Sequence, residues 1–122
     1  MGVWYNYLMN TTEIGRKAEV AARVYLEMRG FKIIEQNWRL PRFEIDIVAT
    51  KDNVIQFVEV KYRIKDDQGS GYDAITVTKL KQMKRAAWAW VDENKYHGEY
   101  ILSAIEVAGK NFTVLSFIEN AY

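Results

Sequence analysis

The chain of 122 residues has a formal net charge of +1 and a hydrophobic fraction of 49%, and it contains no cysteine. This composition predicts a single globular domain over residues 1–122, and the absence of cysteine excludes disulfides and thiolate metal sites and suits a reducing cytoplasm. No apolar run approaches the ~20 residues that span a bilayer, and with a net charge near zero any binding of nucleic acid needs locally concentrated Lys and Arg.

The first predicted element, after a loosely ordered lead-in over residues 1–10, is a helix over residues 12–29. Polar residues at 10–12 supply N-cap candidates, and Gly30 supplies the C-terminal stop. At about 100° per residue, apolar side chains share one arc with Leu26 at its edge: Ile14, Ala18, Ala21, Ala22, Tyr25 and Met28. Glu19 lies about 20° beyond Leu26, where this apolar arc meets the solvated side of the helix.

Three strands are predicted next, over residues 32–37, 43–50 and 54–62. The second strand alternates, so one set of its side chains points to one face: Phe43, Ile45 and Ile47. The intervening set points to the opposite face: Glu44, Asp46 and Val48. The third strand contains the run IQFVEV, which is too apolar for the edge of a sheet.

A flexible loop over residues 65–71 precedes a second predicted helix over residues 76–93. Its buried arc consists of six apolar residues: Val77, Leu80, Met83, Ala87, Trp90 and Val91. Trp88 is also expected in the core. Two closing strands, over residues 100–107 and 112–118, flank a turn at 108–111. Helix, three strands, helix and two strands is the element order of an α/β domain.

Two charged residues inside the apolar third strand, Glu59 and Lys61, are the sharpest feature of the sequence. Charged side chains are almost never buried without partners, and residues two apart on a strand share a face. If a turn of two or four residues joins the second and third strands, Thr50 pairs with Ile55 and Asp46 lies opposite Glu59. A turn of three residues would put the two acids on opposite faces.

Two adjacent carboxylates beside one lysine carry excess negative charge, which a divalent cation such as Mg²⁺ or Mn²⁺ would neutralise. The same arrangement suits phosphodiester hydrolysis, because the metal activates a bound water and the lysine orients that water or stabilises developing charge. Glu19 could reach the same pocket and hold the ion or a water. The alternative is an ion pair of Lys61 with Glu59 or Asp46 on a solvated sheet face, and Glu44 could compete as a ligand.

Basic residues near these acids are candidate contacts for nucleic acid. Arg39, Arg42 and Arg63 lie close to them in sequence, and each arginine can grip two phosphate oxygens. The second helix adds four basic residues that either follow a phosphate backbone or form a solvated face: Lys79, Lys81, Lys84 and Arg85. Trp4 and Trp38 remain open candidates for base stacking, whereas the lone His97 has no partner for a zinc site.

Several motifs together resemble the YraN-like family of bacterial endonuclease-like proteins. The most specific are EIDIVA at 44–49 and FVEVKYR at 57–63, supported by Gly15, Glu19, NWR at 37–39 and Lys79. The resemblance implies the PD-(D/E)xK nuclease superfamily, similarity to archaeal Holliday-junction resolvases, and a restriction-endonuclease-like mixed sheet of about five strands with helices on its faces. It also implies residue roles: Asp46 and Glu59 as metal ligands, Lys61 as the catalytic lysine and Glu19 as an accessory acid.

The resulting hypothesis is a Mg²⁺- or Mn²⁺-dependent nuclease that cuts DNA, more readily than RNA, with branched or damaged DNA as a candidate substrate. One alternative is a nucleic-acid-binding module of the same fold that does not cut, and another is a protein-interaction domain. By analogy with resolvases, which need two active sites, the chain could act as a homodimer. No membrane partner is expected.

Overall fold

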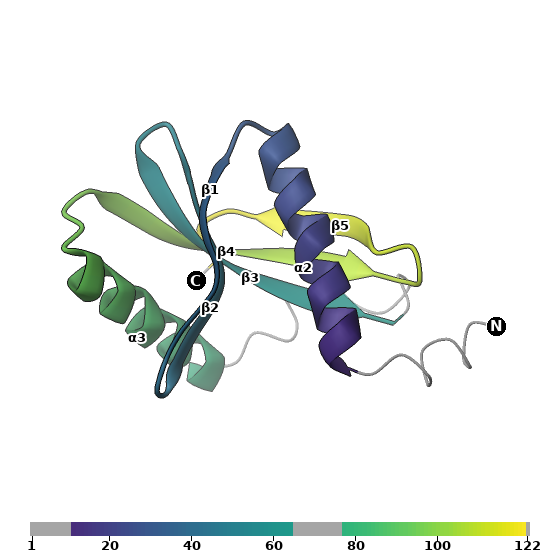
Figure 1. Cartoon of the computed structure of the whole chain (residues 1–122), viewed down its shortest axis with the longest axis horizontal. Coiled ribbons are helices and arrows are strands. Elements are labelled where there is room, and N and C mark those ends of the chain that lie inside the picture. The colour runs from purple at the N-terminus through teal and green to yellow at the C-terminus, as the bar shows by residue number, and fades with distance from the viewer. Residues whose placement is uncertain (1–10, 65–76, 122) are drawn as a thin grey trace.

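The computed structural model describes residues 11–64 and 77–121, which form two helices and one five-stranded sheet (Figure 1). The elements in chain order are α2 (Thr11–Met28), β1 (Lys32–Leu40), β2 (Phe43–Lys51), β3 (Val54–Arg63), α3 (Val77–Asn94), β4 (Glu99–Ala108) and β5 (Thr113–Ile118). This order confirms the predicted α/β succession; β1 to β4 are one to three residues longer than predicted, and β5 begins one residue later. The predicted lead-in at 1–10 and the loop at 65–71 lie outside the described residues.

The strands are arranged in sequence order, and β3 and β4 are the parallel pair in an otherwise antiparallel sheet. Parallel neighbours need a crossover connection, which contains α3. Phe57 packs in the cluster under α3, whereas Val58 packs in the cluster under α2. Because consecutive strand residues point to opposite faces, the two helices cover opposite faces of the sheet, and β3 is buried between them as its apolar sequence predicted.

Helix α2 contacts the sheet through a stripe of three fully buried residues, Ala18, Ala22 and Leu26. Their spacing of four aligns them along one side of the helix. The predicted arc was centred too far from Leu26, and Met28 is wrong as a core residue, because it is 83% exposed. The helix ends as predicted at Gly30, which has φ 91° and starts the turn that leads into β1.

Helix α3 buries Met83, Ala87 and Trp90 as predicted. The prediction is wrong for Val77, which is largely exposed, and for Trp88, which is 63% exposed. Trp88 and Trp90 are about 200° apart around the helix, so one sheet cannot cover both. The indole of Trp90 donates a 2.7 Å hydrogen bond to Glu35 on β1, which ties the helix to the far strand. Neither helix within the described segments is long and apolar enough to cross a bilayer.

The hairpin of β2 and β3 has the predicted register. Asp52 and Asn53 have φ of 54° and 64°, as a two-residue type I′ turn requires, and Thr50 pairs with Ile55. The pairing continues as far as Ile47 opposite Val58. This register brings Asp46 to the level of Glu59 at the point where regular pairing stops.

The predicted alternation along the second strand is wrong at Asp46. Ile45 packs in the cluster under α3, although Ile47, two residues later, packs under α2. The neighbouring strand changes in the same place, because Trp38, the partner of Ile45, is buried under α3. Between the paired positions lies Asn37 with φ 53°, a conformation that breaks the regular pleat. In both strands, therefore, the alternation of side chains between the two faces of the sheet is interrupted at this level. We call this interruption the exchange of faces.

Candidate active site

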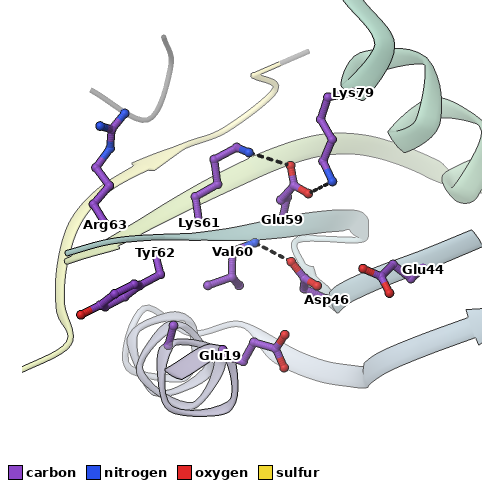
Figure 2. Close-up of a pocket in the computed structure, with 11 residues that line it drawn as sticks. Glu19, Glu44, Asp46, Glu59, Val60, Lys61, Tyr62, Arg63 and Lys79 are labelled. Atoms are coloured by element: carbon purple, nitrogen blue, oxygen red, sulfur yellow. Dashed lines mark hydrogen bonds and ion pairs between the residues drawn. The ribbon is translucent and has the colours of Figure 1, made fainter. Parts of the chain in front are cut away.

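A cavity of about 560 Å³ lies beside β3, between the N-terminal halves of α2 and α3 (Figure 2). Its lining includes all four of the residues predicted to be catalytic: Glu19, Asp46, Glu59 and Lys61. They come from three elements, since Glu19 belongs to α2, Asp46 to β2, and the other two to β3. The structure therefore brings the predicted set together, in an arrangement that differs from the expected one.

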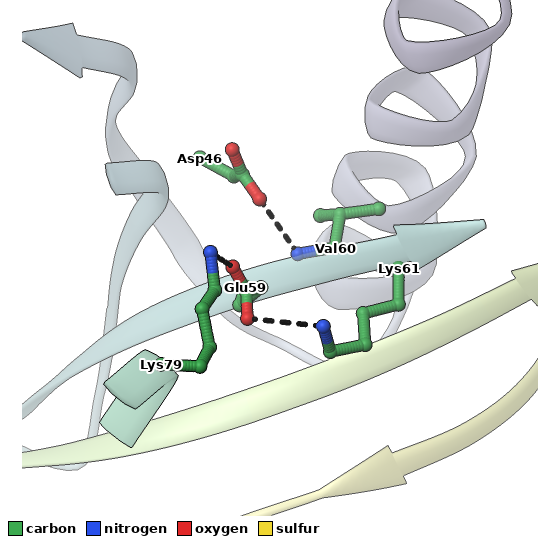
Figure 3. Close-up of polar contacts among 5 residues, drawn as sticks. All are labelled: Asp46, Glu59, Val60, Lys61 and Lys79. Carbon is green, nitrogen blue, oxygen red and sulfur yellow. Dashed lines mark hydrogen bonds and ion pairs between the residues drawn. The ribbon is translucent and has the colours of Figure 1, made fainter. Parts of the chain in front are cut away.

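Asp46 lies at the edge of β3 instead of beside Glu59 on one face of the sheet. Its Oδ2 accepts a 2.8 Å hydrogen bond from the backbone N–H of Val60 (Figure 3). Since the regular pairing of β2 with β3 ends at Ile47 and Val58, this carboxylate supplies β3 with a hydrogen-bond acceptor beyond the regular ladder. The change of faces at this level of β2 explains why simple alternation did not predict the position of Asp46.

The carboxyl group of Asp46 is hard to ionise in this position. Burial raises its pKa from 3.8 to about 6. The nearby carboxylates of Glu19, Glu59 and Glu44 act in the same direction, whereas the Val60 N–H favours the ionised form and lowers the pKa. The site thus concentrates negative charge around a largely buried acid.

Glu59 is only 8% exposed and is held between two lysines (Figure 3). Lys61 Nζ lies 3.5 Å from Oε2, and Lys79 Nζ lies 2.5 Å from Oε1. Lys61 shares a face of β3 with Glu59, as the spacing of two predicted, while Lys79 comes from the first turn of α3. The alternative of a Glu59–Lys61 ion pair is therefore observed, within a cavity instead of on an open sheet face.

Glu19 is half-buried and extends from α2 into the cavity on the Asp46 side of β3 (Figure 2). Burial raises its pKa, whereas a hydrogen bond with the side chain of Asn37 and the charge of Arg39 lower it. Asn37 was not predicted to have a role in the site. Its position in the NWR motif was a signal, but only the folded sheet places it near α2.

The basic residues predicted to contact nucleic acid lie in three different places. Arg63 lines the cavity, but its Nε forms an ion pair with the buried Glu106 of β4. Arg39 and Arg42, near the turn between β1 and β2, line a second cavity of about 440 Å³. Glu44, 3.6 Å from Arg39 Nε, and Lys79 line both cavities. Lys81 and Arg85 are exposed on α3, and the lining of neither cavity includes them.

Comparison with known families adds a finding that is independent of this geometry. The model of uncharacterised protein family UPF0102 matches residues 18–116. The chain belongs to this family. The matched segment contains Glu19, Asp46, Glu59, Lys61 and Lys79, so the candidate site lies within the part shared with UPF0102 proteins.

Individual UPF0102 proteins match most of the chain. The protein from Chlorobium chlorochromatii is 37% identical over 102 residues, which are 84% of this chain and 77% of the relative. The protein from Sulfurihydrogenibium sp. is 36% identical over 115 residues, covering 93% and 97%. The protein from Vibrio parahaemolyticus is 30% identical over 118 residues, covering 93% and 95%. The names of these relatives state no activity.

The donor atoms of this UPF0102 protein suit a hard divalent cation. Mg²⁺ binds through one or two carboxylates and completes its shell with waters and substrate phosphates, and Asp46 and Glu59 line one cavity. The raised pKa of Asp46 reflects, after burial, the surrounding negative charge, which a bound cation would offset. As placed, no three acidic or histidine side chains among the described residues form a ready metal cluster. The residues therefore fit a site with two protein ligands better than a closed cage.

Proposed function

We propose that the protein is a metal-dependent nuclease that hydrolyses phosphodiester bonds in DNA. The observation that carries this proposal is the convergence of Asp46, Glu59 and Lys61 on one cavity, with Glu19 facing them from α2. The resemblance of the EIDIVA and FVEVKYR motifs to PD-(D/E)xK nucleases supports the same chemistry. Burial of Glu59 in contact with lysines supports a reaction site over an incidental surface pair.

Each residue would have a distinct task. Asp46 and Glu59 would bind a Mg²⁺ or Mn²⁺ ion, which when bound supplies activation of water and polarisation of the phosphoryl oxygen. Lys61 would hold the attacking water or neutralise charge that develops on the phosphate. Glu19 would accept a hydrogen bond from a water on the opposite side of β3, in an orientation that Asn37 stabilises.

The second cavity suggests how DNA would approach. Arg39 and Arg42 line it, and Lys79 connects it with the cavity that holds Glu59. Arginine pairs well with phosphate oxygens, so a strand would lie with one phosphate near the β1–β2 turn and another near Lys61.

The test is a cleavage assay with Mg²⁺ or Mn²⁺ on single-stranded, duplex and four-way DNA. We expect Lys61→Ala and Asp46→Asn to reduce the rate by at least about a hundredfold, because the first removes the ammonium beside the reacting phosphate and the second removes a metal ligand. Lys32→Ala is the matched control, since Lys32 is exposed at the start of β1 and lines neither cavity, and it should cleave at nearly the wild-type rate. Wild-type activity no higher than that of Lys61→Ala on all substrates would contradict the proposal.

A nucleic-acid-binding module without cleavage is the second candidate. It is favoured by the two lysines that already neutralise Glu59 and by the separate basic cavity of Arg39 and Arg42. DNA binding that persists in a chelator and in Asp46→Asn, with no cleavage by any form of the protein, would support this second function.

A further inference from the structure

Lys79 differs from the other basic residues of α3 in its surroundings. Its ammonium lies 2.5 Å from Glu59 Oε1, and its side chain is 35% exposed (Figure 3). Lys81, Lys84 and Arg85 are exposed. On the helix, Lys79 lies about 40° from Met83, within the arc that faces the sheet. Lys79, in the first turn of α3, therefore forms an ion pair with the buried carboxylate of Glu59.

Both oxygens of Glu59 are engaged by ammonium groups, Oε2 by Lys61 and Oε1 by Lys79. A divalent cation bound to Glu59 would lie close to at least one of these ammonium groups. Like charges at such distances repel strongly in a partly buried site. One lysine must therefore move when Glu59 becomes a metal ligand.

Lys79 is better able to move than Lys61. Lys61 lies two residues from Glu59 on the same strand and is the less exposed of the two lysines. Lys79 belongs to a different element and lines both cavities, so its flexible stem has an alternative position toward the Arg39 and Arg42 side. An anion in that second cavity would offer the ammonium a new partner.

We propose that Lys79 is the counter-ion of Glu59 in the metal-free site and becomes a contact for a substrate phosphate once Glu59 binds a divalent cation. This inference rests on the proposed function and adds a coupling between metal and DNA. Lys79 leaves Glu59 only when a second positive charge replaces it there. The protein therefore gains a phosphate contact in the metal-bound state that the metal-free state lacks.

Two measurements test this coupling with Lys79→Met, which removes the charge and preserves most of the side-chain length. The first is the affinity for Mn²⁺ alone, measured by titration calorimetry. We expect Lys79→Met to bind Mn²⁺ about tenfold more tightly, because the competing cation is gone. Lys79→Arg retains the charge and should stay near the wild-type affinity, as should Lys81→Met, the control on the exposed side of α3.

The second measurement is the affinity for a short DNA duplex, with Ca²⁺ as a divalent ion and again in a chelator. Lys79→Met should weaken binding several-fold with Ca²⁺ and leave it nearly unchanged in the chelator, because the phosphate contact forms only after Glu59 has a cation. Thermal unfolding of each variant checks that the fold is intact. A purely structural lysine would not change the two affinities in opposite directions.

Each outcome bears on a defined part of the inference. Unchanged or weaker Mn²⁺ binding by Lys79→Met overturns the counter-ion role. An equal loss of DNA affinity with and without Ca²⁺ overturns the switch, since Lys79 would then be a permanent phosphate contact. If both expected differences appear and the wild-type protein cleaves no DNA, the inference stands and the proposed nuclease function fails.

Discussion

At Asp46, stability and the proposed function oppose each other. Its carboxylate bonds the Val60 N–H at the edge of β3, yet burial and three neighbouring acids raise its pKa to about 6. At neutral pH the folded protein must hold this acid ionised in surroundings that disfavour the charge. Such a cost is typical of functional sites, where charge is arranged for a ligand instead of for the fold.

The first prediction at this scale concerns Asp46→Asn and pH. The pKa of Asp46 is 3.8 in the unfolded chain and about 6 in the folded protein. Between these pH values the folded protein therefore still binds the proton that the unfolded chain has released. The contribution of protonated Asp46 to the free energy of unfolding is therefore fully present below pH 3.8 and is lost as the pH rises through about 6. We expect Asp46→Asn to be more stable than wild type by about 1 to 3 kcal/mol at pH 8, with a smaller difference at pH 4.

Urea denaturation at the two pH values measures this difference. Asp92→Asn is the control for the same chemical change at an exposed position on α3, away from the cavity. A stability difference for Asp46→Asn that is the same at pH 4 and pH 8 would contradict the assigned ionisation behaviour.

At the scale of elements, the exchange of faces in β1 and β2 decides how the site is built. The two strands pair both before and after this level, but Asn37 has φ 53°. Its side chain also bonds Glu19, so one residue joins the irregularity of the sheet to an acid on α2. Asn37 therefore affects two residues of the candidate site, Asp46 through the strand irregularity and Glu19 through the hydrogen bond.

The second prediction separates the backbone role of Asn37 from its side-chain role. Both Asn37→Ala and Asn37→Gly remove the hydrogen bond to Glu19, but only glycine adopts a positive φ without steric cost. We expect the alanine variant to be about 1 kcal/mol less stable than the glycine variant, which reverses the usual preference for alanine. Chemical denaturation checks the order, and an alanine variant as stable as the glycine variant would show that the backbone here relaxes easily.

At the scale of the whole molecule, a polar network joins the buried centre of the sheet to the C-terminal segment. Ser103 Oγ donates a 2.7 Å hydrogen bond to Gln56 Oε1, and Gln56 Nε2 donates a 3.0 Å bond to Glu119. The backbone N–H of Ala121 reaches the carbonyl of Leu102 at 2.8 Å. The segment after β5 thus returns to the parallel pair β3–β4 at the centre of the sheet.

The third prediction is that Gln56→Leu destabilises the protein by about 1 to 3 kcal/mol, because buried Ser103 loses its acceptor. Adding Ser103→Ala removes the unsatisfied hydroxyl and should recover part of this loss, which a double-mutant cycle measures. Gln36→Leu, at an exposed position on β1, is the control. Additive effects of the two core substitutions would argue against coupling through this network.

Features that depend on neighbouring residues could be predicted from the sequence alone. Asp52 and Asn53 indicated a turn between β2 and β3, although the turn length that sets the register became clear only in the structure, and Gly30 marked the end of α2. Two charges in an apolar strand, Glu59 and Lys61, indicated where the candidate site would lie, and both line its cavity. Turn chemistry, helix capping and periodicity act over a few residues, so they can be read without knowledge of the fold.

Features that depend on contacts between distant elements could not be predicted before the fold was known. Asp46 points to the edge of β3 because β1 and β2 exchange faces together at Asn37, and Trp88 is exposed because the sheet covers one side of α3. Lys79 reaches Glu59 because the crossover between parallel strands lays α3 over β3. Strand pairing and helix packing join residues far apart in the chain, and their directions follow from the assembled sheet, which local patterns do not specify.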